Sequence, residues 1–239
     1  MFEKLEKLQI FWLGIILALG LIFAVSTATK NMSNDKITVT GSAYKIVQSD
    51  SGRLEFEISA RKATKQESYN NIKSQIPIVM KYLKDNNITD IEVKAANGYP
   101  SYRYTPNGSM TNDIAYYNLS QTIVAKSNDV NKIKEISTDI QNLIDQGVDI
   151  NIVNAEYFYS KLGDLKIELL KDATTDAKER ANAMLKATHN HPGKIQSVQM
   201  GVFQITPVDS TNVSDMGIND TSSIEKKVTA VANIVFRIK

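Results

Sequence analysis

The chain contains no cysteine in its 239 residues. Without a thiol it can form no disulfide, no zinc–cysteine site and no thiolate nucleophile, and it offers no cysteine for lipid attachment. Burial of apolar side chains alone must therefore stabilise the folded part. The absence of cysteine fits an exported protein without requiring one.

The chain also lacks an excess of charge of one sign. Its 28 Lys and Arg residues are nearly balanced by 26 Asp and Glu residues, and the two signs are interspersed. Nucleic-acid-binding surfaces need clustered positive charge, which this pattern does not provide. We therefore expect no nucleic-acid partner.

Only one run is long and apolar enough for a bilayer. Residues 9–29 carry no charge and lie between Lys7 and Lys30. As a helix they would span roughly 31 Å, close to the hydrocarbon thickness of a membrane. We predict a cytoplasmic tail at 1–8, a transmembrane anchor at 9–29 and a tether at 30–35, with the C-terminal domain facing the periplasm or the cell exterior.

A cleavable signal peptide is the alternative reading of this segment. The basic start and the small residues Ala24, Ser26 and Ala28 fit it. The apolar core, residues 10–25, is longer than the roughly 7 to 15 residues of a typical signal, which favours a retained anchor.

Periodicity after the tether predicts an α+β fold of mostly antiparallel sheets packed on helices. Period-two alternation indicates strands, and apolar residues at steps of three and four indicate helices. The predicted order is β-β-α-β-β-α-β-α-β-β. We expect one domain at 36–239, made of two α/β subdomains, the first at about 36–88 with 162–239 and the second at about 89–161.

Local signals fix several of these elements. The runs at 37–40 and 53–61 are predicted to pair as a hairpin, and Thr64-Lys-Gln-Glu67 has the spacing of a helix capping box. Pro77 falls inside that helix and predicts a kink. Asn107-Gly108 predicts a second, tyrosine-rich hairpin, and Gly147 is placed to end the helix that Asp129 caps. Further along the chain, the pattern predicts a helix from Asp164 to about Thr188, a strand at 194–206 and a long loop at 207–223.

Residues that could carry chemistry are few. Glycines stand singly, so no phosphate-binding loop is visible, and His189 and His191 are the only histidines. Two histidines in a loop are too few for a metal site without further ligands. Glu55 and Glu57 share one face of a strand, which is typical of its solvated side. We expect no enzyme, no cofactor and no metal.

Tyrosine is the residue type that suggests function. Rings with polar tips suit interfaces, although cross-strand packing within one subunit explains the same pattern. The interface candidates are Tyr99, Tyr102, Tyr104, Tyr116, Tyr117, Tyr157 and Tyr159.

Four segments in this order resemble a SIMPL-domain (YggE-like) protein. They are the opening Ile37-Thr-Val-Thr-Gly41, the Leu83-Lys-Asp-Asn-Asn-Ile88 segment, the Ala-rich helix Asp172–Ala183 and the closing strand Val228–Ile238. The chain departs from the family pattern at Thr188-His-Asn-His191, where Ala-Gly-like residues are usual, and at Ser49-Asp50, where a proline is frequent.

The resemblance implies an exported, envelope-associated α+β domain without established enzymatic activity. It also implies a loose link to oxidative-stress defence and a family that includes large ring-like homo-oligomers. Our first hypothesis is therefore a non-enzymatic, membrane-anchored envelope protein that assembles into a ring or scaffold. The alternative is a binding module that holds an envelope glycan, peptide or partner protein between its subdomains.

Overall fold

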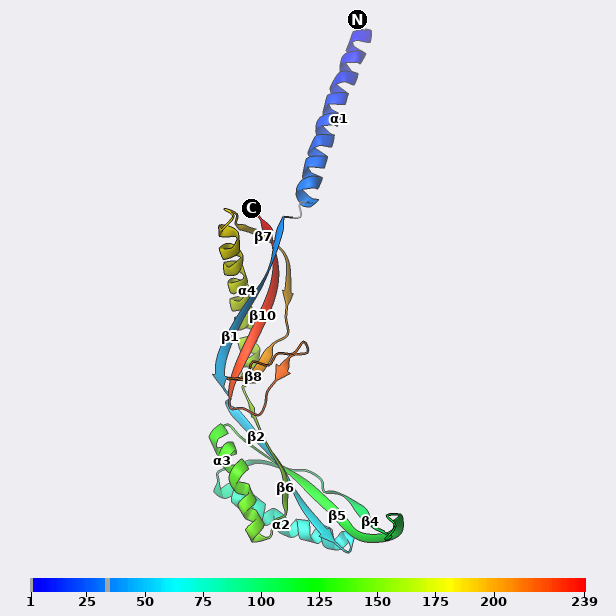
Figure 1. The fold of residues 1–239 in the computed structure, drawn as a ribbon, viewed down its shortest axis with the longest axis vertical. Coiled ribbons are helices and arrows are strands. Elements are labelled where there is room, and N and C mark those ends of the chain that lie inside the picture. Colours follow the sequence, from blue (N-terminus) through cyan, green and yellow to red (C-terminus); the bar gives the residue numbers. More distant parts are fainter. Residues whose placement is uncertain (1, 33–34) are drawn as a thin grey trace. The chain divides into compact units, whose positions relative to one another are not determined.

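The computed structural model describes the backbone of residues 2–32 and 35–239, with the side chains of residues 12–27 and 35–239 (Figure 1). The elements are α1 (Phe2–Met32), β1 (Lys36–Gln48), β2 (Ser51–Lys62), α2 (Lys65–Asp85), β3 (Asp90–Val93), β4 (Asn97–Tyr104), β5 (Met110–Ser127), α3 (Val130–Asp139), the 3-10 helix η1 (Ile140–Gln146), β6 (Ile150–Phe158), α4 (Leu162–Lys186), β7 (Pro192–Met200), β8 (Gln204–Pro207), β9 (Ile218–Asn219) and β10 (Glu225–Ile238).

Helix α1 contains the segment predicted as an anchor. Among the described residues, no helix has the length and apolarity that a membrane crossing needs. The predicted span at 9–29 extends past the described side chains of α1 at both ends, so that part of the prediction lies outside the described residues. The anchor stays a prediction.

Five strands form a sheet in which β3, β5, β2 and β6 are neighbours in that order, with β4 also pairing with β5. All of these pairings are antiparallel. Leu54, Phe56 and Ile58 of β2 are fully buried on the face covered by α2 and α3. This face holds a core whose fully buried members all lie between residues 54 and 157.

The remaining strands form a second sheet in the order β1-β10-β8-β9, with β7 also pairing with β10. The contact between β8 and β9 is parallel. Helix α4 is tied to β1 by an ion pair between Lys45 and Glu168 and by a hydrogen bond from the Ser42 N–H to the Asp176 carboxylate. The structure thus confirms an α+β fold of mostly antiparallel sheets packed on helices.

The chain divides into two compact units. One comprises residues 1–41, 177–199 and 233–239, and the other comprises 42–176 and 200–232. The subdomain boundaries expected from the sequence stay a prediction.

The predicted hairpin between the first two strands is wrong. Strand β1 belongs to the sheet with β10, whereas β2 pairs with β5 and β6. Between the two strands, the Ser49 N–H donates to the Ile224 carbonyl and the Asp50 N–H donates to the Phe158 carbonyl. The turn residues therefore bond to distant segments, and the chain passes from one sheet to the other.

Other local predictions are confirmed. Thr64 and Glu67 form the capping box of α2, Pro77 lies inside that helix, and Asn86 caps its end. Gly147 ends η1 with a left-handed φ of 84°. The strand predicted at 194–206 is divided into β7 and β8, and the loop predicted at 207–223 contains the short strand β9.

Candidate functional site

An aromatic hairpin of β4 and β5 is the first candidate surface. Tyr99 is paired with Asn118, and Tyr104 with Met110. The connecting turn is closed by hydrogen bonds between Thr105 and Ser109, and Gly108 adopts a φ of 81°. Among the described residues β4 pairs with β5 alone, so its other edge is unpaired.

Large apolar surfaces on this hairpin face the solvent. Tyr99 is 63% exposed, Tyr104 67% and Met110 65%. Tyr102 is 36% exposed and Ile114 39%. Together they give the hairpin a group of exposed rings and apolar side chains beside an unpaired strand edge.

The two remaining tyrosines of the hairpin are half-buried and contact their own subunit. The Tyr116 ring lies 5.6 Å from the Arg61 guanidinium carbon, a cation–π contact. The Tyr117 carbonyl accepts a hydrogen bond from the Ser68 hydroxyl at 2.9 Å. Packing within one subunit accounts for these two positions.

The structure places the other two candidates elsewhere. Tyr157 of β6 belongs to the core and is 5% exposed. Burial raises the pKa of its hydroxyl, and a hydrogen bond with Ser137 partly offsets this. Tyr159 is half-buried and lines a cavity of about 110 Å³. Five of the seven tyrosines therefore come together on the hairpin.

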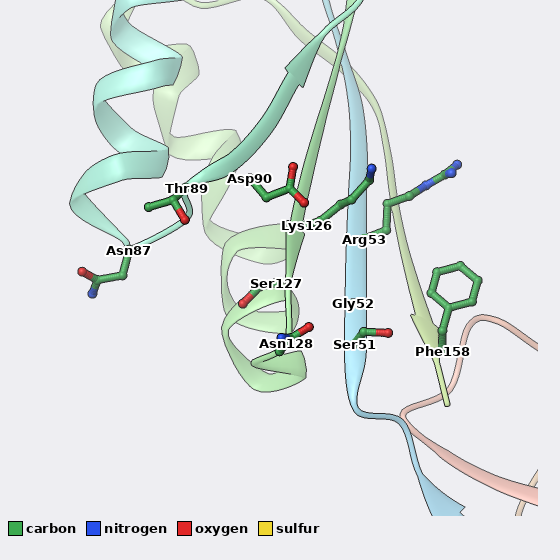
Figure 2. Close-up of a pocket in the computed structure, with 10 residues that line it drawn as sticks. All are labelled: Ser51, Gly52, Arg53, Asn87, Thr89, Asp90, Lys126, Ser127, Asn128 and Phe158. Atoms are coloured by element: carbon green, nitrogen blue, oxygen red, sulfur yellow. The ribbon is translucent and has the colours of Figure 1, made fainter. Parts of the chain in front are cut away.

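A polar pocket of about 460 Å³ at one end of the first sheet is the second candidate site (Figure 2). Arg53 of β2 lies opposite Lys126 of β5, and Lys126 lies opposite Asp90 of β3. Residues paired in this way project to the same face of the sheet. The pocket is lined by Ser51, Gly52, Arg53, Asn87, Thr89, Asp90, Lys126, Ser127, Asn128 and Phe158.

The two cations of the pocket differ in their partners. Arg53 contacts Glu55 at 2.9 Å and Glu156 at 3.1 Å. Lys126 is exposed, and no ion-pair partner is found for it within the described part of the chain. Its ammonium is thus the free cation of the pocket. The sequence alone does not indicate this site, because Arg53, Lys126 and Asp90 come together only when three strands pair in register.

The other residues considered for chemistry have structural surroundings. His191 exchanges backbone hydrogen bonds with Lys239, and His189 has a φ of 58° at the end of α4. Glu55 is ion-paired with Arg53 and also with Lys94 at 3.3 Å. Within residues 12–27 and 35–239 there is no group of three or more His, Cys, Asp and Glu side chains that could hold a metal.

These features define an α+β protein with two mostly antiparallel sheets, an exposed aromatic hairpin and a polar pocket. The SIMPL family model, described as a protein of unknown function (DUF541), matches residues 37–236. The chain belongs to the SIMPL family, which confirms the resemblance noted in the sequence. No curated protein matches the chain.

Proposed function

We propose that this protein is a non-enzymatic, single-pass envelope protein whose folded domain assembles into a ring-like or scaffold homo-oligomer through the β4–β5 hairpin. The exposure of Tyr99, Tyr102 and Tyr104 beside an unpaired strand edge is the observation that carries the proposal. Aromatic residues are enriched at the centres of protein interfaces, and unpaired edges accept further strands.

The uncharged segment at 9–29 supports the membrane part of the proposal. It would hold the domain at the membrane with its C-terminal part in the periplasm or outside the cell. Anchoring confines copies to a surface and so raises their effective concentration. Weak contacts between domains would then suffice for assembly. The link to oxidative-stress defence stays an expectation of the resemblance.

The test compares molecular masses by light scattering. The full chain extracted in mild detergent is measured beside a shortened chain that begins at Asn34. We expect one discrete large species from both, because the hairpin lies in the folded domain. Monomers in both would overturn the proposal.

Matched variants then locate the contact. Replacing Tyr99, Tyr102 and Tyr104 together by Ser should convert the large species to smaller ones. Tyr44→Ser is the control, because Tyr44 is 66% exposed and lies on β1, away from the hairpin sequence. An equal loss of mass in both variants would show that the hairpin is not the specific contact.

The polar pocket favours a second candidate function, the binding of an envelope glycan, peptide or partner protein. Its free Lys126 ammonium, its amide and hydroxyl groups and the Phe158 ring could orient such a ligand. Saturable binding of soluble cell-wall fragments, weakened at least tenfold by Lys126→Ala with the mass unchanged, would support this candidate. Binding lost instead in a Tyr102→Ala, Tyr104→Ala variant would move the ligand to the hairpin.

A further inference from the structure

Strand β7 is an edge strand without cover. Its sheet partner among the described residues is β10 alone, so its other edge is unpaired (Figure 1). Residues 194–200 are all exposed, including Ile195 at 51%, Val198 at 55% and Met200 at 57%. Because successive residues of a strand face opposite sides, both faces of β7 are open to solvent.

The usual protection of a strand edge is confined to the first residues of this strand. β7 begins with Pro192 and carries Lys194, but no charged residue occurs between Ile195 and Val208. Soluble proteins normally guard free edges with lysine, other charges, proline or bulges, because an unguarded edge pairs with other chains. Two other edge strands carry charged residues: β1 contains Lys36 and Lys45, and β6 contains Glu156.

Hydrogen bonds at both ends of β7 join this segment to β10. His191 and Lys239 donate to each other's carbonyls at 2.8 and 2.9 Å, and the Gly201 N–H donates to the Val231 carbonyl at 2.9 Å. Backbone N–H and C=O groups point to both sides of a strand. The groups of β7 that point away from β10 are therefore available to a further strand.

We infer that β7 pairs antiparallel with β7 of a second copy. When the two-fold axis between the copies passes through Ser197, Lys194 of one copy lies opposite the uncharged Met200 of the other. The two copies then bring no like charges together, which favours β7 of a second copy as the partner over a charged strand edge. The two Lys194 residues then lie at opposite ends of the ladder, about 20 Å apart. Such a contact is self-complementary, as a two-fold interface requires. The inference rests on the proposed self-association, for which it names a second surface.

The cysteine-free chain gives a direct test. At the two-fold axis, Ser197 of one copy lies opposite Ser197 of the other, and directly opposite residues of paired strands have Cβ atoms about 4.5 to 5.5 Å apart, near the reach of a disulfide. The scan uses Gln196→Cys, Ser197→Cys and Val198→Cys in the full chain in mild detergent, and each variant is oxidised briefly. We expect strong cross-linking at Ser197→Cys or one neighbour, at least fivefold above the exposed helix control Ser74→Cys. Equal, weak cross-linking at all positions would overturn the inference.

A second variant separates this contact from the hairpin contact. Ser197→Lys places two lysines opposite each other at the axis, where like charges repel, and its exposed position leaves the fold in place, so the mass should fall. If only Ser197→Lys lowers the mass, the β7 pairing is supported and the hairpin proposal fails. If only the triple tyrosine variant lowers the mass, the hairpin proposal is supported and the β7 pairing fails. A wild-type monomer without cross-linking contradicts both.

Discussion

At the scale of the residue, Gly98 is required by close packing between β4 and β5. A Cβ at this position would lie 2.6 Å from Leu119 Cγ and 2.7 Å from the Asn118 carbonyl oxygen. We expect Gly98→Ala to lower the free energy of unfolding by about 1 to 3 kcal/mol, because the strand must shift. The free energy is measured by urea denaturation.

The matched control is Gly163→Ala at the start of α4. Nothing lies within 4 Å of a Cβ there. Alanine is the better helix former, so this variant should be neutral or up to about 1 kcal/mol more stable. Equal stability of the two variants would contradict the packing argument.

The carboxyl group of Asp220 has a strongly perturbed pKa. Burial alone raises the pKa of its carboxyl, but hydrogen bonds from Ser223 and Ser222 and the nearby Lys226 ammonium outweigh burial and lower the pKa to about 2. Lys226 also donates to the Asp220 carbonyl at 2.7 Å. Burial lowers the pKa of Lys226, and the contacts with Asp220 oppose that change.

This acid should make stability depend on pH. Its folded pKa of about 2 lies below the ordinary value of 3.8, so its stabilisation is complete above pH 4 and is lost as the pH falls toward 2. We expect Asp220→Asn to cost about 2 kcal/mol at pH 7 and clearly less at pH 2.5. Urea denaturation at both values, with the exposed Asp209→Asn as control, measures the difference; a pH-independent loss would contradict it.

At the scale of the element, the sequence was most informative where the signal is local. The caps of α2, the Asn107-Gly108 turn and the end of η1 each depend on a few neighbouring residues. The partner of β2 could not be predicted this way, because β5 and β6 are distant in sequence. The tyrosine-bearing hairpin was likewise predictable, whereas the Arg53–Lys126–Asp90 row depends on the register of three strands.

Helix α4 shows the limit of periodicity. The helix predicted from Asp164 to about Thr188 lies within two residues of α4 at either end. Its buried side chains recur at steps of four, namely Leu165, Leu169, Ala173, Ala177, Ala181 and Leu185. The spacing of the alanines does not show which neighbouring leucines are buried with them, because the buried face of the helix is determined only by packing in the folded structure.

Pro77 gives a prediction for α2. It lies within the helix at an exposed position and cannot donate to the Lys73 carbonyl. We expect Pro77→Ala to stabilise the protein by about 1 to 3 kcal/mol, because alanine restores a helical hydrogen bond. Ser74→Ala on the same helix should change stability by less than about 0.5 kcal/mol. No gain from Pro77→Ala would mean that the surrounding structure has adapted to proline.

At the scale of the whole molecule, one sheet and its core come from a single uninterrupted stretch of chain. Strands β2 to β6 with α2, α3 and η1 span residues 51–158, and the fully buried members of their core lie within 54–157. Among the residues whose side chains the structure describes, partly buried Ile224 is the one contributor to this core from outside the stretch. The second sheet takes its strands from the chain segments before and after residues 51–158.

A fragment comprising residues 50–161 should therefore fold without the rest of the chain. It retains the complete sheet and the core of Leu54, Phe56 and Ile58, and loses only a few edge contacts, such as the hydrogen bond from the Tyr157 N–H to Thr221. We expect cooperative urea unfolding and native-like circular dichroism. Phe56→Ala in the same fragment should remove about 3 to 5 kcal/mol, a large part of the stability of a small domain, and abolish the transition. A gradual, non-cooperative loss of signal in the unsubstituted fragment would show that this core needs the second sheet.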